Sequence, residues 1–92
     1  MDIHFIFARK CDKCMSMRQL LNALITYHNI GVQVNCIEYD SDKEEAIDAA
    51  IKYGIMDIPG CWIDGVVIEG DDFEKDDIVS AMKKLADKLK TA

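Results

Sequence analysis

The 92-residue sequence contains one proline, no low-complexity segment and no internal repeat. Proline-rich and repetitive stretches are typical of linkers and disordered tails, so nothing divides the chain into separate parts. Half of the residues are apolar, and a chain of this length can bury a modest core. We therefore predict a single compact domain over residues 1–92.

Long apolar runs are also missing. No run approaches the roughly 20 residues that a membrane-spanning helix needs. The apolar stretch at residues 1–8 is too short for a secretory signal, and charge follows it at once. We therefore expect a cytoplasmic protein that has no membrane partner. Thiols stay reduced in the cytoplasm, so a close pair of cysteines there is more typically catalytic or metal-binding than structural.

Basic residues are scarce, with 11 Lys and Arg against 17 Asp and Glu and a net charge of −6. This acidic balance disfavours nucleic acid as a partner. The exception is a small cationic group near the first two cysteines, which consists of Arg9, Lys10, Lys13 and Arg18. Cations beside a thiol favour its ionised form, so their position suits thiol chemistry.

The first half of the chain is predicted to form a strand, a helix and a second strand. Residues 3–8 are a short apolar run rich in strand formers. From Asp12, apolar side chains recur every three or four residues, which predicts a helix that ends at Gly31. Residues 32–39 again favour a strand. A strand–helix–strand unit is right-handed with parallel strands, so the first two strands should run in parallel.

The second half is predicted to add a helix, a hairpin and a last helix. Ser41 and Glu44 form a capping-box motif before a helix that runs to about residue 53. Asp64-Gly65 is a strong hairpin signal between strands 61–63 and 66–69. The apolar face of the helix before residue 53 is predicted to comprise Ala46, Ile47, Ala50 and Ile51. A second capping box, from Asp71 to Glu74, is predicted to begin the last helix. The fold class is therefore α/β, of order βαβαββα, with a mixed four-stranded sheet flanked by three helices.

The most informative motif is Cys11-Asp-Lys-Cys14, where the first strand gives way to the first helix. Thiols at this spacing in a first helical turn are close enough to form a disulfide. Free N–H groups and the helix dipole favour a thiolate at Cys11. We predict that Cys11, at the exposed end, is the nucleophile that attacks a substrate disulfide. Cys14, one turn deeper, is then the thiol that resolves the mixed disulfide.

The order of these motifs resembles the thioredoxin superfamily. The motifs are a leading strand, a CxxC at a helix start, Ile58-Pro59 before a hairpin, and Gly70-Asp71-Asp72 before the last helix. The match is best to the small glutaredoxin-like members and covers nearly the whole chain. It implies a thiol–disulfide oxidoreductase that reduces disulfides of proteins or small molecules. Its electrons would come from glutathione, as a co-substrate and not as a tightly bound cofactor, or from a flavoprotein disulfide reductase. We expect it to act as a monomer.

The resemblance also implies substrate-binding residues. Pro59 would be a cis-proline that faces the cysteines, and the backbone of Ile58 would pair with an extended substrate. Gly70 and Asp71 lie where glutaredoxins hold the γ-glutamyl end of glutathione. Lys10 lies near the lysine that meets its other carboxylate.

The sequence departs from the glutaredoxin pattern at three places. Asp12-Lys13 stands where Pro-Tyr is usual, Asp57-Ile58 stands for Thr-Val, and Glu69 stands for the first of two glycines. Glu69 adds a negative charge beside the expected anion site.

Two other functions would use the same residues. The first is a metal or iron–sulfur binding module, in which Cys36 and Cys61 complete the four ligands that a zinc site needs. Both cysteines, however, fit more simply as small buried apolar residues. The second is a redox-silent adaptor that binds peptides at the Pro59 groove, which predicts that Cys11 and Cys14 can be changed to serine without loss of function.

Overall fold

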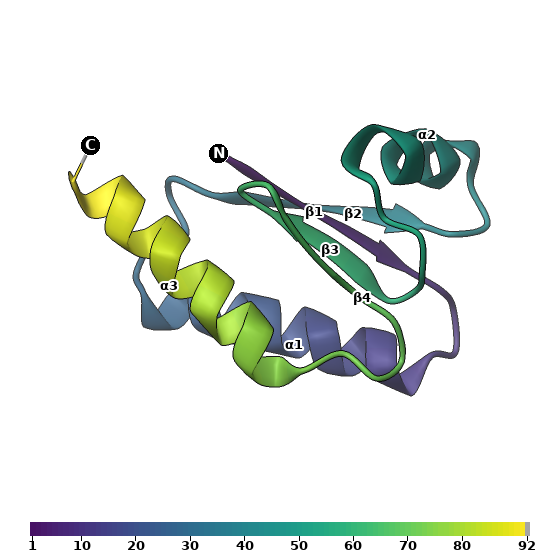
Figure 1. The fold of residues 1–92 in the computed structure, drawn as a ribbon, viewed down its shortest axis with the longest axis horizontal. Helices are drawn as coiled ribbons and strands as arrows, with labels where there is room; N and C mark the ends of the chain where they lie inside the picture. The colour runs from purple at the N-terminus through teal and green to yellow at the C-terminus, as the bar shows by residue number, and fades with distance from the viewer. Residues whose placement is uncertain (92) are drawn as a thin grey trace.

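Within the described residues, seven elements follow one another in the predicted order (Figure 1). The computed structural model describes residues 1–91. The strands are β1 (Asp2–Phe7), β2 (Asn35–Asp40), β3 (Gly60–Ile63) and β4 (Val66–Glu69), and the helices are α1 (Asp12–Tyr27), α2 (Glu44–Tyr53) and α3 (Lys75–Thr91). The α/β fold of order βαβαββα is thereby confirmed. None of the helices in residues 1–91 is long and apolar enough to cross a membrane.

The four strands form one mixed sheet in the order β2-β1-β3-β4. As predicted, β1 and β2 are parallel, while β3 pairs antiparallel with both β1 and β4. Helices α1 and α3 cover one face of the sheet, and α2 covers the other (Figure 1). The carboxyl end of β1, which is a central strand of the sheet, leads to the start of α1, so the cysteine pair follows the end of a central strand.

Alternation along the strands divides the core into two parts. Ile3 and Phe5 of β1 and Cys61 of β3 face α1 and α3, and they belong to the larger apolar cluster. Helix residues complete that cluster, among them Met17, Leu21, Ile78, Met82 and Leu85. The intervening residues of the strands face α2. The cysteine pair therefore rests on the larger cluster, since Cys14 belongs to it.

The smaller cluster under α2 contains an aromatic group around His4. The imidazole stacks on Tyr53 with 3.8 Å between ring centroids, and its Nδ1 lies 2.8 Å from the hydroxyl of Tyr39. The ring of Trp62 of β3 is tilted against that of His4, with 5.6 Å between the ring centroids. Burial lowers the pKa of His4, so the imidazole is neutral at pH 7 and fits this packed position.

The end of α1 differs from the prediction. The helix ends at Tyr27, four residues before Gly31, because Asn29 adopts the left-handed conformation with φ 56°. Asparagine tolerates this conformation, and the N–H of Ile30 then donates to the carbonyl of Ile25 in a Schellman-type ending. Val32 is fully exposed in the following turn, so β2 begins at residue 35 and not at residue 32.

Both predicted capping boxes are wrong. The N-cap of α2 is Lys43, whose side chain makes no capping bond. The preceding turn is organised instead by Asp40, whose carboxylate accepts from the N–H of Asp42 at 3.0 Å. Helix α3 begins at Lys75, so Asp71 lies too far from its first turn to cap it.

The predicted apolar face of α2 is also partly wrong. Ala46 and Ala49 are buried, whereas Ile47 and Ile51 are exposed. The small alanine side chains let α2 approach the sheet closely, and the isoleucines are left on the outer side.

Candidate active site

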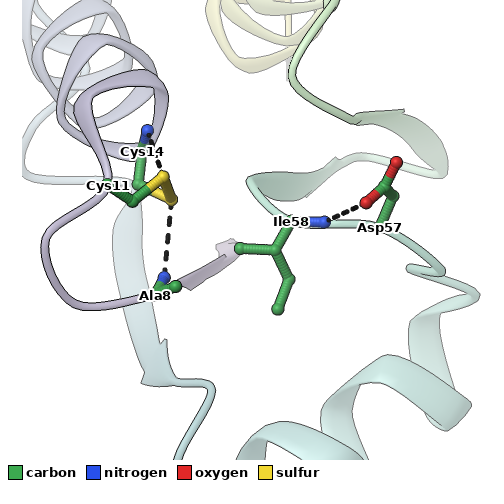
Figure 2. Close-up of a disulfide and its surroundings, with 5 residues drawn as sticks. All are labelled: Ala8, Cys11, Cys14, Asp57 and Ile58. Atoms are coloured by element: carbon green, nitrogen blue, oxygen red, sulfur yellow. Dashed lines mark hydrogen bonds between the residues drawn. A yellow bond between two sulfur atoms is a disulfide. The ribbon is translucent and has the colours of Figure 1, made fainter.

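The cysteine pair lies at the amino end of α1, as the sequence predicts. Cys11 is the N-cap residue with φ −121°, and Cys14 belongs to the first helical turn. The two are joined in a disulfide, with 5.2 Å between their α-carbons (Figure 2). Cys11 is half-buried, whereas Cys14 is 2% exposed. An incoming disulfide therefore has access to the sulfur of Cys11 and not to that of Cys14.

Each sulfur of the pair accepts a hydrogen bond from the main chain. The N–H of Cys14 donates to Sγ of Cys11 at 3.1 Å, and the N–H of Ala8 donates to Sγ of Cys14 at 3.4 Å (Figure 2). Such donors, together with the positive end of the helix dipole, favour negative charge on sulfur. The hydrogen bond from the N–H of Cys14 and the start of the helix both act on the sulfur of Cys11, which is the more exposed cysteine of the pair.

The loop before β3 forms the other side of the site. The Ile58–Pro59 peptide bond is cis, and Ile58 lies in the surroundings of the disulfide (Figure 2). Ile58 and Cys11 both pack against the larger apolar cluster. The carbonyl of Pro59 accepts from the N–H of Gly70 at 2.8 Å, which attaches this loop to the end of β4.

Two carboxylates hold this loop from within. Oε2 of Glu69 accepts from the N–H groups of Met56 and Asp57, the latter at 2.9 Å. Oδ1 of Asp57 in turn accepts from the N–H of Ile58 at 2.9 Å (Figure 2). The sequence marks both acids as departures from the glutaredoxin pattern, but it does not indicate these bonds. The backbone donor that was expected to meet a substrate is therefore occupied by the chain's own carboxylate.

Three of the predicted substrate-binding residues, Ile58, Pro59 and Gly70, are neighbours. Asp71 follows Gly70 and is exposed, as is Lys10, which adopts a left-handed conformation with φ 55° directly before Cys11. The position expected to hold an anion is bordered by acids. A Cβ placed on Gly70 would lie 3.0 Å from Oδ1 of Asp72 and 3.2 Å from Oδ2 of Asp57.

Comparison with known proteins identifies the family. A family model described as thioredoxin domain matches residues 1–83. The chain belongs to the thioredoxin-domain family. The resemblance to the thioredoxin superfamily that the motifs indicate is thereby confirmed. No curated protein matches this thioredoxin domain in sequence.

Solved structures of thioredoxin-like proteins share the fold of this thioredoxin domain. The thioredoxin-like protein BC3987 is 23% identical with a TM-score of 0.61, over 86% of this chain and 97% of that chain. Thioredoxin O2 from Arabidopsis thaliana in the oxidized state is 19% identical with a TM-score of 0.70, over 92% of this chain and 74% of that chain. Mitochondrial thioredoxin 3 from Saccharomyces cerevisiae in the oxidized form is 18% identical with a TM-score of 0.60, over 90% and 76%.

The other two cysteines of the thioredoxin domain are free thiols in apolar surroundings. Burial raises the pKa of Cys36 to about 11 and that of Cys61 to about 12. Both thiols are therefore protonated at neutral pH. Within residues 1–91, no three His, Cys, Asp or Glu side chains gather in a group that could hold a metal ion.

These pKa values predict a large difference in reactivity among the four cysteines. After reduction of the folded protein, iodoacetamide at pH 8 is expected to modify Cys11 first and to leave Cys36 and Cys61 unmodified. The thiolate is the reacting species, and raised pKa values keep both thiols protonated until well above pH 9. Peptide mapping by mass spectrometry, with denatured protein as the control, measures this. Modification of Cys61 as fast as Cys11 would contradict it.

Proposed function

We propose that the chain is a dithiol–disulfide oxidoreductase that reduces disulfides of proteins or small molecules. The observation that carries the proposal is the Cys11–Cys14 disulfide at the start of α1, with Cys14 buried and Cys11 accessible beside the loop of Ile58. Membership of the thioredoxin-domain family supports the same chemistry.

The reaction proceeds by two successive exchanges. The thiolate of Cys11 attacks one sulfur of the substrate disulfide, the substrate S–S bond breaks, and the leaving thiolate takes a proton from water. Cys14 then gives its proton to water and attacks Sγ of Cys11, which releases the second substrate thiolate to be protonated by water and leaves the Cys11–Cys14 disulfide. Two electrons have passed from the cysteine pair to the substrate. The N–H groups of Cys14 and Ala8 stabilise the charge on sulfur at each stage.

The electron donor that fits this site best is a flavoprotein disulfide reductase. Glutathione carries two carboxylates and one ammonium group, and the position where it was expected to bind is bordered by the carboxylates of Asp57 and Asp72. The carboxylates of glutathione would be repelled by the carboxylates of Asp57 and Asp72, and solvent screens this repulsion only in part. Asp57 and Asp72 therefore favour an electron donor that exchanges thiols with the cysteine pair without binding near Gly70.

Equilibration in a series of glutathione redox buffers tests the proposed function. We expect Cys11 and Cys14 to convert together from two thiols to one intramolecular disulfide, which mass analysis of acid-trapped protein detects as the loss of two hydrogens. Cys36→Ser serves as a control, because this thiol lies outside the pair and should leave the midpoint unchanged. A protein that forms no internal disulfide at any buffer ratio would not be a dithiol oxidoreductase.

A further inference from the structure

The N–H of Ile58 is a main-chain hydrogen-bond donor in the loop beside the disulfide. It is the last N–H before β3 begins, because proline has none, and Ile58 lies in the surroundings of the disulfide (Figure 2). Its acceptor is not a strand neighbour but the carboxylate of the preceding residue, Asp57, at 2.9 Å. Asp57 is exposed, so this carboxylate can be displaced without disturbing the core.

An extended peptide binds beside a strand end by pairing its carbonyls with such free main-chain donors. In this protein a substrate carbonyl has to compete with Asp57 for the N–H of Ile58. An ionised acceptor forms the stronger hydrogen bond. A neutral peptide therefore competes poorly, unless the displaced carboxylate gains a new partner.

The described part of the chain shows no such partner for Asp57. None of the ion pairs within residues 1–91 involves Asp57. Its other oxygen, Oδ2, faces the region of Gly70, which Asp72 also borders, and Glu69 occupies the adjacent N–H groups. The surroundings of Asp57 thus favour the approach of a positive charge and disfavour a negative one.

We propose that Asp57 determines the specificity of the exchange site. Its carboxylate occupies the N–H of Ile58 in the resting protein and releases it to peptide disulfides that carry a lysine or arginine next to the reacting cysteine. The basic side chain of the substrate pairs with the displaced carboxylate, and the substrate carbonyl takes its place on Ile58. This inference rests on the proposed function and names the substrate class of the same site.

Single-turnover reduction of matched peptide disulfides by the pre-reduced protein tests the proposal. The peptides differ only in the residue next to the cysteine, which is Lys, Ala or Glu. At low salt the native protein is expected to reduce the Lys peptide about fivefold faster than the Glu peptide, the effect of a well-placed exposed ion pair. In Asp57→Ala this ratio is expected to collapse, while reduction of the Ala peptide is expected to accelerate by about fivefold, because Ile58 is no longer occupied. Asp87→Asn, an equal charge change on the exposed side of α3, should leave both results unchanged.

A small neutral disulfide without peptide groups, bis(2-hydroxyethyl) disulfide, separates specificity from thiol reactivity. Its rate is expected to change much less than the peptide rates in Asp57→Ala, because it has no carbonyl to pair with Ile58. A rate that changes as much as the peptide rates would place the action of Asp57 on the cysteines and overturn the proposal. Unchanged peptide preferences in Asp57→Ala would also overturn it. Failure of the native protein to reduce any of these disulfides would instead refute the proposed function.

Discussion

Replacement of Cys11 by serine is expected to abolish turnover, whereas replacement of Cys14 by serine is expected to leave a protein that attacks once and then stops. A serine hydroxyl is not ionised at neutral pH and cannot open a disulfide. In Cys14→Ser the thiol of Cys11 remains accessible at the helix start, but the group that would resolve the mixed disulfide is missing. The protein therefore accumulates bound to its substrate through Cys11.

The two variants are distinguished by mass spectrometry after incubation with a peptide disulfide under non-reducing conditions. Cys14→Ser should carry one covalently attached peptide, and Cys11→Ser should carry none. Cys36→Ser is the matched control, because it also removes one thiol but retains the pair, and it should turn over normally. Equal residual turnover in Cys11→Ser and Cys14→Ser would show that the two roles are assigned incorrectly.

A second large effect is expected for Gly60→Ala. Gly60 is buried at the start of β3, directly after Pro59. An added Cβ would lie 2.7 Å from the carbonyl oxygen of Asp57 and would also collide with Cγ2 of Ile55. The carbonyl belongs to a loop that Glu69 holds in place, so it cannot move alone. Overpacking of this kind costs about 1–3 kcal/mol, equivalent to a fall in Tm of roughly 5–20 °C for a domain of this size.

Thermal unfolding of the oxidised protein, followed by far-UV circular dichroism, measures this effect. Gly31→Ala is the control. A Cβ there would meet only Cγ2 of Ile25 at 3.8 Å, which is an ordinary contact, and its Tm should stay close to that of the native protein. The same Tm in Gly60→Ala and Gly31→Ala would mean that the loop before Pro59 moves to accommodate the added Cβ without loss of stability. The steric argument would then be wrong.

The sequence predicts the architecture well because apolar periodicity and the hairpin signal depend on neighbouring residues. It fails at element ends, where the outcome depends on competing local bonds. Gly31 is the more obvious helix terminator, but Asn29 takes the left-handed conformation first. Ser41 has the better capping motif, but the carboxylate of Asp40 organises the turn.

The candidate active site also contains some features that the sequence predicts and others that it does not. The spacing of Cys11 and Cys14 and the place of Pro59 can be recognised along the chain. The bonds of Glu69 to the N–H groups of residues 56 and 57 cannot, because they join the end of β4 to a loop more than ten residues away. The occupied N–H of Ile58 follows from the rotamer of a single exposed side chain, for which the sequence has no signal.

The aromatic group under α2 determines which structural change the tryptophan fluorescence of this protein can report. Trp62 is the only tryptophan, and it packs with its ring centroid 5.1 Å from that of Tyr53 on α2. Its neighbour Cys61 points to the opposite face of the sheet, into the cluster that contains Cys14. The indole and the cysteine pair thus lie on opposite faces of the sheet, so a change in tryptophan fluorescence is expected to report the detachment of α2 more than the oxidation state of the cysteine pair.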